Sequence, residues 1–265
     1  MHRGEWSRSR YWLCQFLYSR HDRGPIGWSA PVALDEPQRR LLARWLRSPR
    51  EDVTTALWLV GRALPDCHRD PAYVQSLRLM AKERQYHRDL RRRLADQICP
   101  SPGHGRPASA SRGSALRRRL LGCRFEMSLL LLRDCAELIL LDRLVERDAD
   151  PTVTAVCRNL AKDKRAHIGF VAERLTALYA DFNFIRRNLR RLRLRVMCAA
   201  VLTRDACRHW PLARRFGFPA TALLTEGARR FAYLLERITP YRRDALLAAL
   251  LSQRSEPYAK TARLP

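Results

Sequence analysis

An internal repeat constrains the fold of this 265-residue chain more than any other feature of its sequence. Residues 70–87 read DPAYVQSLRLMAKERQYH and residues 150–167 read DPTVTAVCRNLAKDKRAH, so the two segments align without a gap at an offset of 80. The identical pairs are Asp70/Asp150, Pro71/Pro151, Arg78/Arg158, Ala81/Ala161, Lys82/Lys162 and His87/His167. Two unrelated helices that each start with Asp-Pro would explain only the first two pairs. The longer match predicts a duplicated helical hairpin and hence a four-helix bundle.

The chain is predicted to be all-α, because no window alternates with the period of two that marks a strand. We expect the bundle over residues 35–180, with helices at about 49–64, 70–98, 115–147 and 150–179 and a loop over 99–115. A short helix over about 35–47 precedes Ser48, Pro49 and Glu51, which are typical of a helix N-terminus with a capping box.

The two ends of the chain are expected to lie outside this bundle. Residues 1–34 contain several Gly and Pro and are predicted to form an irregular, basic and aromatic arm. Residues 181–265 are predicted to form a basic helical extension, with helices near 184–202, 218–238 and 241–252 and a break around Trp210 and Pro211.

Composition limits the classes of protein to which the chain can belong. No apolar run approaches the roughly 18 residues of a membrane-spanning helix. The eight cysteines show neither zinc-type spacing nor C-x-x-C pairs, and no convincing secretory signal is present, so a reduced, cytoplasmic protein is expected. The net charge of +25 predicts attraction to nucleic acid, anionic lipid or an acidic protein, although the ratio of 47 Arg to 4 Lys indicates a compositional bias as well.

The two repeated histidines are predicted to face the core. At 100° per residue, His87 shares its helix face with Met80 and Leu90, and His167 shares its face with Leu160 and Val171. The third helix of the bundle presents Glu126, Arg133 and Glu137 on an otherwise apolar face. Buried carboxylates need a metal ion or a cation beside them, and pairing of Arg133 with Glu126 or Glu137 is the structural alternative to a metal site.

These residues resemble the ferritin-like family, in particular a bacterial group of ferritin-like domain proteins with a basic C-terminal extension. The resemblance covers roughly residues 36–240 and is best over RFEMSLLLLRDCAELILL (124–141), PTVTAVCRNLAKDKRAHIGFVAERL (151–175) and HWPLARRFGFPATALLTEGARRFAYLLERI (209–238). In that family a di-metal centre uses one Glu from each of two helices and Glu-x-x-His from each of the other two.

The resemblance implies that half of this ligand set has been replaced. His87 and His167 align with the two family histidines, and Glu137 aligns with the lone Glu of the third helix. Arg84 and Lys164 stand where the family has the Glu of each Glu-x-x-His, and Ser48 stands at the lone first-helix Glu. Because Arg cannot be deprotonated and Lys opposes a metal ion, we expect no cofactor, with Lys164 or Arg84 paired to Glu137, Glu83 or Asp163.

Two functions follow from this comparison. In the first, the chain is a non-catalytic or metal-degenerate ferritin-like protein with a structural or interaction role. In the second, it is an iron- or manganese-dependent oxidoreductase with a shifted ligand set, because Glu83/His87 and Asp163/His167 each place two ligands four residues apart and Glu137 adds a fifth.

The basic extension supports a third interpretation. Ile185, Leu189, Leu192 and Val196 form an apolar stripe at helical spacing. The surrounding basic residues are Arg186, Arg187, Arg190, Arg191, Arg193 and Arg195. A stripe that docks on the bundle and exposes a solvated charged face is the structural interpretation, whereas a patch for nucleic acid or an anionic membrane surface is the functional one. A homodimer is compatible with either interpretation, and the aromatic residues within 6–18 could stack on nucleic-acid bases.

Overall fold

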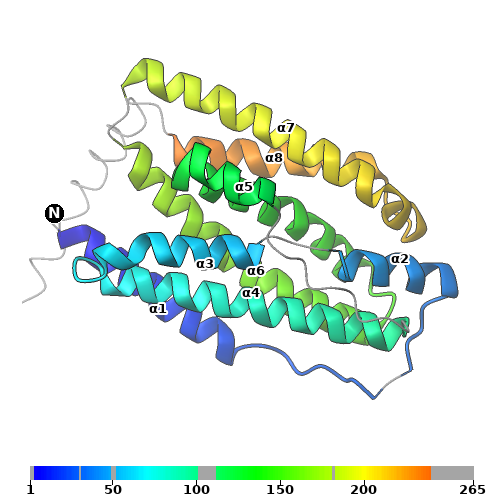
Figure 1. The fold of residues 1–265 in the computed structure, drawn as a ribbon. Helices are drawn as coiled ribbons and strands as arrows, with labels where there is room; N and C mark the ends of the chain where they lie inside the picture. Colours follow the sequence, from blue (N-terminus) through cyan, green and yellow to red (C-terminus); the bar gives the residue numbers. More distant parts are fainter. Residues whose placement is uncertain (1–2, 30, 49–51, 101–111, 181–182, 240–265) are drawn as a thin grey trace, which may run out of the picture.

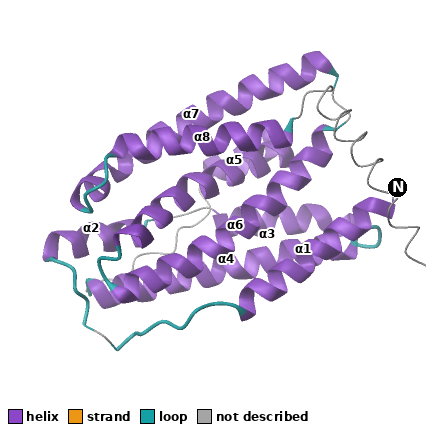
Figure 2. Ribbon diagram, turned by 180° about the vertical axis from the view of Figure 1, so that it is seen from behind, coloured by secondary structure: helices purple, strands orange, loops and turns teal. Residues whose placement is uncertain are grey.

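The computed structural model describes residues 3–29, 31–48, 52–100, 112–180 and 183–239. The described part of the chain is all-helical and contains no strand (Figures 1 and 2). The expected helix over 241–252, the capping residues Pro49 and Glu51 and most of the loop over 99–115 lie outside the described residues.

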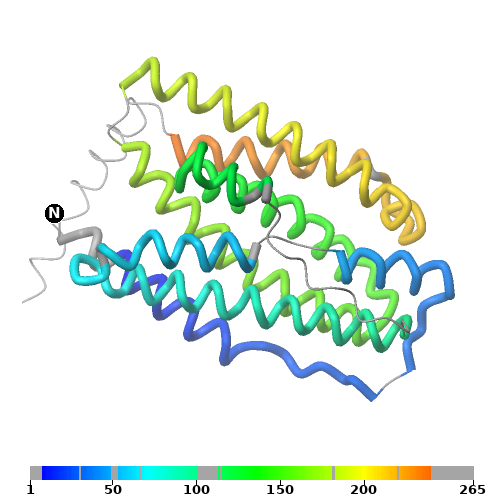
Figure 3. Tube along the Cα trace, in the orientation of Figure 1, coloured from blue at the N-terminus to red at the C-terminus, as the bar shows by residue number. Residues whose placement is uncertain are grey.

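The centre of the described structure is enclosed by α4 (Pro71–Ile98), α5 (Arg112–Arg147), α6 (Pro151–Tyr179) and the consecutive helices α2 (Glu36–Leu46) and α3 (Asp52–Ala63). Helices α2 and α3 follow one another along α4, and a 3-10 turn at Leu64–Asp66 ends α3 (Figure 3). Helices α5 and α6 form the most extensive helix pair of the structure. The expected boundaries over 35–47, 70–98 and 150–179 are therefore confirmed to within one residue at each end.

The Asp-Pro pairs of the repeat act as helix starts in both copies. The Asp70 carboxylate accepts a hydrogen bond from Tyr73 N at 2.9 Å, and the Asp150 carboxylate accepts one from Val153 N at 2.9 Å. Each Asp satisfies a backbone N–H that the first helical turn leaves without a partner, and the following Pro has no N–H to satisfy. The repeat thus sets the start of α4 and of α6 in the same way.

Helices α4 and α5 run in the same direction. Arg84 pairs with Asp134 and Arg91 pairs with Glu137, so a step forward along α4 matches a step forward along α5. Helix α5 bends at Gly122, whose φ of 73° is disfavoured for side chains other than glycine. Before the bend, Arg118 donates to the hydroxyls of Thr54 and Thr55 and so ties the start of α5 to α3.

The N-terminal segment is helical, so the prediction of an irregular arm over 1–34 is wrong for its first part. Helix α1 (Arg3–His21) packs along α4 and α6. Trp12 and Phe16 lie four residues apart and contact Phe170 at ring-centroid distances of 6.0 and 5.4 Å. The cluster of Gly and Pro that suggested an irregular arm lies at residues 24–31, after the end of α1. Tertiary packing of Trp12 and Phe16 stabilises the helix.

The described part of the basic extension, residues 183–239, forms two helices on one side of the molecule. Helices α7 (Phe184–Arg215) and α8 (Ala220–Ile238) pack on each other and on α5 (Figures 1 and 2). The predicted break at Trp210 and Pro211 is wrong, because α7 continues through Pro211. Pro211 lies in the last two turns of α7, and the chain turns instead at Gly217, whose φ is 70°.

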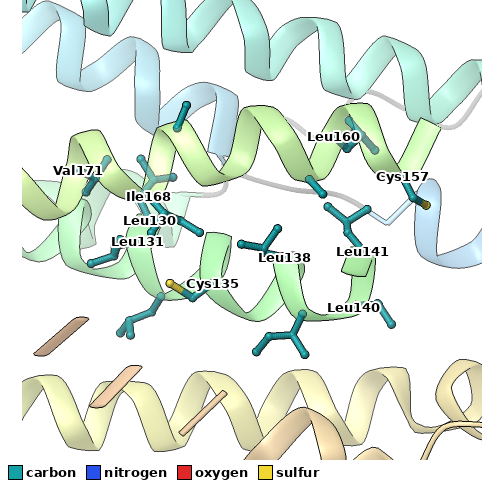
Figure 4. Packing of buried hydrophobic residues seen from close by; sticks show 14 of the residues in the cluster. Leu130, Leu131, Cys135, Leu138, Leu140, Leu141, Cys157, Leu160, Ile168 and Val171 are labelled. Carbon is teal, nitrogen blue, oxygen red and sulfur yellow. The ribbon is translucent and has the colours of Figure 1, made fainter. Parts of the chain in front are cut away.

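The core is a continuous set of aliphatic side chains between these helices. Leu130, Leu138, Leu160 and Val171 pack at the contact of α5 with α6 (Figure 4). All eight cysteines are unpaired thiols, and burial raises the pKa of Cys157 to about 12. Within the described residues, none of the helices combines the length and the hydropathy needed to cross a bilayer.

Candidate functional site

Four buried side chains of α4 and α6 pair crosswise between the two copies of the repeat. His87 Nε2 lies 2.8 Å from Asp163 Oδ2, and His167 Nε2 lies 2.7 Å from Glu83 Oε2. Each histidine contacts the acid that precedes the other histidine by four residues. Because residues four apart share a helix face, each copy presents one acid and one imidazole to the other copy. All four residues are at most 2% exposed.

Two arginines of the N-terminal segment contact the same acids. Arg20 Nε, in the last turn of α1, donates to Glu83 Oε1 at 3.3 Å. Arg23 Nη2 donates to Asp163 Oδ2 at 2.7 Å and lies 3.8 Å from Glu83 Oε1. Phe16 packs against His167 with ring centroids 5.7 Å apart. Helix α1 and the residues after it therefore cover the paired acids and histidines and bring positive charge to them.

A second group of charges connects α5 to the repeat. Lys164 Nζ lies 2.6 Å from Asp134 Oδ1 and 3.2 Å from Glu137 Oε2. Arg84 donates from Nη1 to Asp134 Oδ1 at 3.1 Å and from Nη2 to Oδ2, and Arg91 pairs with Glu137. Arg84 and Lys164 occupy equivalent positions of the repeat, so both copies direct a cation at the same carboxylate.

We call these two groups together the buried network. Its α4 members are Glu83, Arg84, His87 and Arg91, its α5 members are Asp134 and Glu137, its α6 members are Asp163, Lys164 and His167, and Arg20 and Arg23 join it from the N-terminal segment.

Burial and neighbouring charge perturb several pKa values in the network. Burial lowers the pKa of His87 to about 4, despite the opposing effect of the Asp163 contact. Burial and then the charge of Asp163 raise the pKa of Glu83 to about 7, although Arg20 and Arg23 act the other way. Burial alone would raise the pKa of Asp134, but the charges of Arg84 and Lys164 hold it well below its usual range.

The network does not fit a di-metal centre. The Nε2 atoms of His87 and His167 already contact carboxylates, and Asp163 also accepts from Arg23. Lys164 and a permanently charged guanidinium, that of Arg84, lie among the acids. Across the described ranges, no three His, Cys, Asp or Glu side chains are arranged to hold a metal ion.

The structure brings most of the sequence-predicted residues together. Glu83, His87, Glu137, Asp163 and His167, the five proposed ligands, all belong to the buried network. The expected pair of Lys164 with Glu137 is present at 3.2 Å.

Two sequence-predicted positions lie elsewhere. Ser48 follows α2 as a half-buried residue whose N–H donates to Trp45 O at 3.1 Å. Glu126 accepts from Arg117 Nε at 2.6 Å, a partner that the sequence did not suggest, and it lies outside the buried network.

Sequence reasoning missed several members of the network. Asp134 lies three residues before Glu137, and two acids at this spacing within an apolar run share a buried helix face. That spacing was a usable signal. Arg20, Arg23 and Arg91 carried no comparable signal, because the chain contains 47 Arg and most of them are not in the core.

The apolar stripe of the basic extension does not dock on the bundle. Ile185, Leu189, Leu192 and Val196 point outward, whereas Leu194 and Cys198 form the buried face of α7. The structural interpretation of the sequence is therefore wrong, because α7 has apolar residues on two opposite faces and the set that includes Leu194, Cys198 and Leu212 is the one that packs. Among the surrounding arginines, Arg186, Arg193 and Arg195 are exposed, Arg187 and Arg190 are half-buried, and Arg191 is buried.

The N-terminal aromatic residues divide between packing and exposure. Phe16 is fully buried and Trp12 Nε1 donates to Glu173 Oε2 at 3.0 Å, so neither is available for base stacking. Tyr11 and Tyr18 are exposed.

Comparison of the chain with protein-family models, with curated proteins and with solved structures found no match. The ferritin-like resemblance therefore rests on the sequence motifs alone and stays a prediction.

Proposed function

We propose that this protein is a metal-free ferritin-like bundle with a structural or interaction role rather than a catalytic one. The observation that carries the proposal is the position of the Lys164 ammonium, 2.6 Å from Asp134 and 3.2 Å from Glu137 in the centre of the helices. Arg84 occupies the equivalent position of the other repeat and contacts the same Asp134. In the family that the sequence resembles, both positions carry a metal-binding Glu.

The charge balance of the buried network supports this substitution of side chains for metal ions. Two divalent ions would bring four positive charges to four carboxylates. The network likewise has four carboxylates, and the four least exposed of the cations that contact them are Arg23, Arg84, Arg91 and Lys164. The more exposed Arg20 adds a fifth positive charge at the periphery. Buried carboxylates are thereby neutralised within the protein, as their burial requires.

The arrangement of the helices gives independent support. Helices α4 and α5 run in the same direction although they are consecutive helices of the bundle. A parallel pair of this kind is typical of ferritin-like bundles, which have one long crossover, and not of simple up-down bundles. Helices α5 and α6 follow as a hairpin with only residues 148–150 between them.

The proposal is tested by elemental analysis of protein purified from medium supplemented with iron and manganese. The matched variants are Glu137→Gln, in the network, and Glu226→Gln, on α8 at the surface. We expect the natural protein and both variants to contain the same trace of metal. Near-stoichiometric iron or manganese that Glu137→Gln loses and Glu226→Gln keeps would overturn the proposal and favour the oxidoreductase alternative.

A further inference from the structure

Helix α7 presents a continuous apolar stripe to solvent. The exposed fractions are 75% for Ile185, 66% for Leu189, 58% for Leu192 and 61% for Val196. Spacings of four, three and four residues keep these side chains on one face, roughly opposite the buried Leu194. Single exposed leucines are ordinary on protein surfaces, but an aligned set of this kind indicates a binding face.

Two exposed aromatic residues lie toward the ends of the same helix. Phe184 is 72% exposed at the start of α7, and Trp210 is 51% exposed near its end. Helix α7 lies at the outer edge of the helical array in both views, with α8 beside it (Figures 1 and 2). The stripe, which spans residues 185–196 of the 32-residue helix, therefore lies on the outside of the molecule.

The charge around the stripe is almost entirely positive. Arg186, Arg195 and Arg204 are exposed residues of α7. At 100° per residue, Arg186 and Arg204 lie on one side of the stripe and Arg195 lies on the other. The one acidic residue in the sequence of α7, Asp205, is half-buried.

We propose that α7 is a docking face for the surface of an anionic phospholipid bilayer. A helix with an apolar stripe between arginines lies in the plane of a membrane interface, with its apolar side chains among the acyl chains and its cations at the lipid phosphates. The interior ion pairs of the buried network take no part in this contact. The membrane-docking proposal is therefore independent of the proposed metal-free function, and each can fail without the other.

Other occupants match the face less well. A second copy of α7 would place arginine opposite arginine, and nucleic acid would leave the aliphatic side chains in water. The chain's own residues 240–265 contain five basic and two acidic residues, so their charge does not complement the face. An anionic bilayer satisfies both the apolar and the charged components.

The test is flotation of the full-length protein with vesicles of phosphatidylcholine alone or with about one third phosphatidylglycerol, in about 0.15 M salt. The first variant, Leu189→Ser/Leu192→Ser, removes the centre of the stripe. Its control, Leu57→Ser/Leu120→Ser, changes two leucines that are at least as exposed on average but lie on α3 and α5. The second variant, Arg186→Gln/Arg195→Gln/Arg204→Gln, is compared with Arg78→Gln/Arg92→Gln/Arg119→Gln, which removes the same charge from exposed residues of α4 and α5.

We expect the natural protein and both controls to float with anionic vesicles only. The leucine variant should bind about thirtyfold more weakly, because two half-inserted leucines are lost. The arginine variant should bind about a hundredfold more weakly, since each of the three arginines near an anionic surface contributes about a fivefold change in affinity. Equal loss in variant and control would overturn the proposal, because binding would then reflect only the net charge of +25.

Two other results would also overturn it. Retention of vesicle binding by the leucine variant, together with tight binding to DNA, would assign the face to nucleic acid. Light scattering that shows a dimer of the natural protein, abolished by Leu189→Ser/Leu192→Ser and unaffected by vesicles, would assign it to a second copy.

Discussion

Removal of the central ammonium, by Lys164→Met, tests whether the buried network holds the helices together. Methionine is unbranched and close to lysine in length, so it fills the same space without the charge. The substitution leaves Asp134 with Arg84 and Glu137 with Arg91, but deprives each carboxylate of a contact, at 2.6 and 3.2 Å respectively. Both buried carboxylates then lose the ammonium that they share, and each depends on its arginine.

The expected loss in the free energy of unfolding is about 3 kcal/mol. Removing one partner of a buried ion pair costs about 3–5 kcal/mol, and the lower end applies because each carboxylate keeps one arginine. The loss should shrink below about pH 4. Asp134 has a pKa held below its usual range, so its ion pairs stabilise the fold above that range and lose their effect as the pH falls.

The assay is urea unfolding followed by circular dichroism at neutral pH. Lys162→Met is the matched control, because Lys162 lies two residues earlier on α6 and pairs with Asp22 at the surface, where we expect a change of about 0–1 kcal/mol. Equal stability of the two lysine variants would refute the reasoning.

Three further outcomes are expected. Gly169→Ala should destabilise the protein by about 1–3 kcal/mol and loosen α1, because the new Cβ would lie 2.5 Å from the Trp12 ring. Limited proteolysis would detect the loosened helix. The control Gly61→Ala, with open space around it, should be neutral or stabilising. Folding raises the pKa of Glu83 to about 7, so the contribution of Glu83 to stability falls as the pH rises from 4.5 to 7. Folding lowers the pKa of His87 to about 4, so the contribution of His87 to stability rises as the pH rises from 4 to 6.5. In Glu83→Gln only the His87 effect remains, so the free energy of unfolding should rise by about 2–4 kcal/mol between pH 4 and 6.5. A free energy of unfolding that does not change over this range would contradict the lowered pKa of His87. His87→Gln should produce the opposite slope between pH 4.5 and 7, and a rise in its place would count against the crosswise pairing.

The local signals in the sequence predicted much of the fold. Asp70 and Asp150 cap their helices as the repeat indicated, and the inward positions of His87 and His167 followed from the period of the helix. These features depend on residues close together in the chain, where propensity and hydrogen bonding are decisive.

Features that depend on packing between distant segments could not be predicted. Helix α1 is stabilised because Phe16 packs against His167, about 150 residues later in the chain. Helix α7 buries the face that contacts α5 and α8. Its hydrophobic period alone does not indicate that Leu194 is buried and Leu192 exposed. Partner choice in the network, such as Arg84 with Asp134, is likewise set by the register of two helices.

The direct test of the central claim, that side-chain cations stand in the place of metal ions, is a restoration experiment. Arg84→Glu/Lys164→Glu returns both positions to the residue type of the ferritin-like motif, and thermal unfolding is then measured against Mn²⁺ concentration. We expect the variant to be unstable without metal and to gain about 3 kcal/mol at a hundredfold excess over its Kd, while the natural protein does not respond. Stabilisation of the natural protein by Mn²⁺, with no response of the variant, would contradict the account.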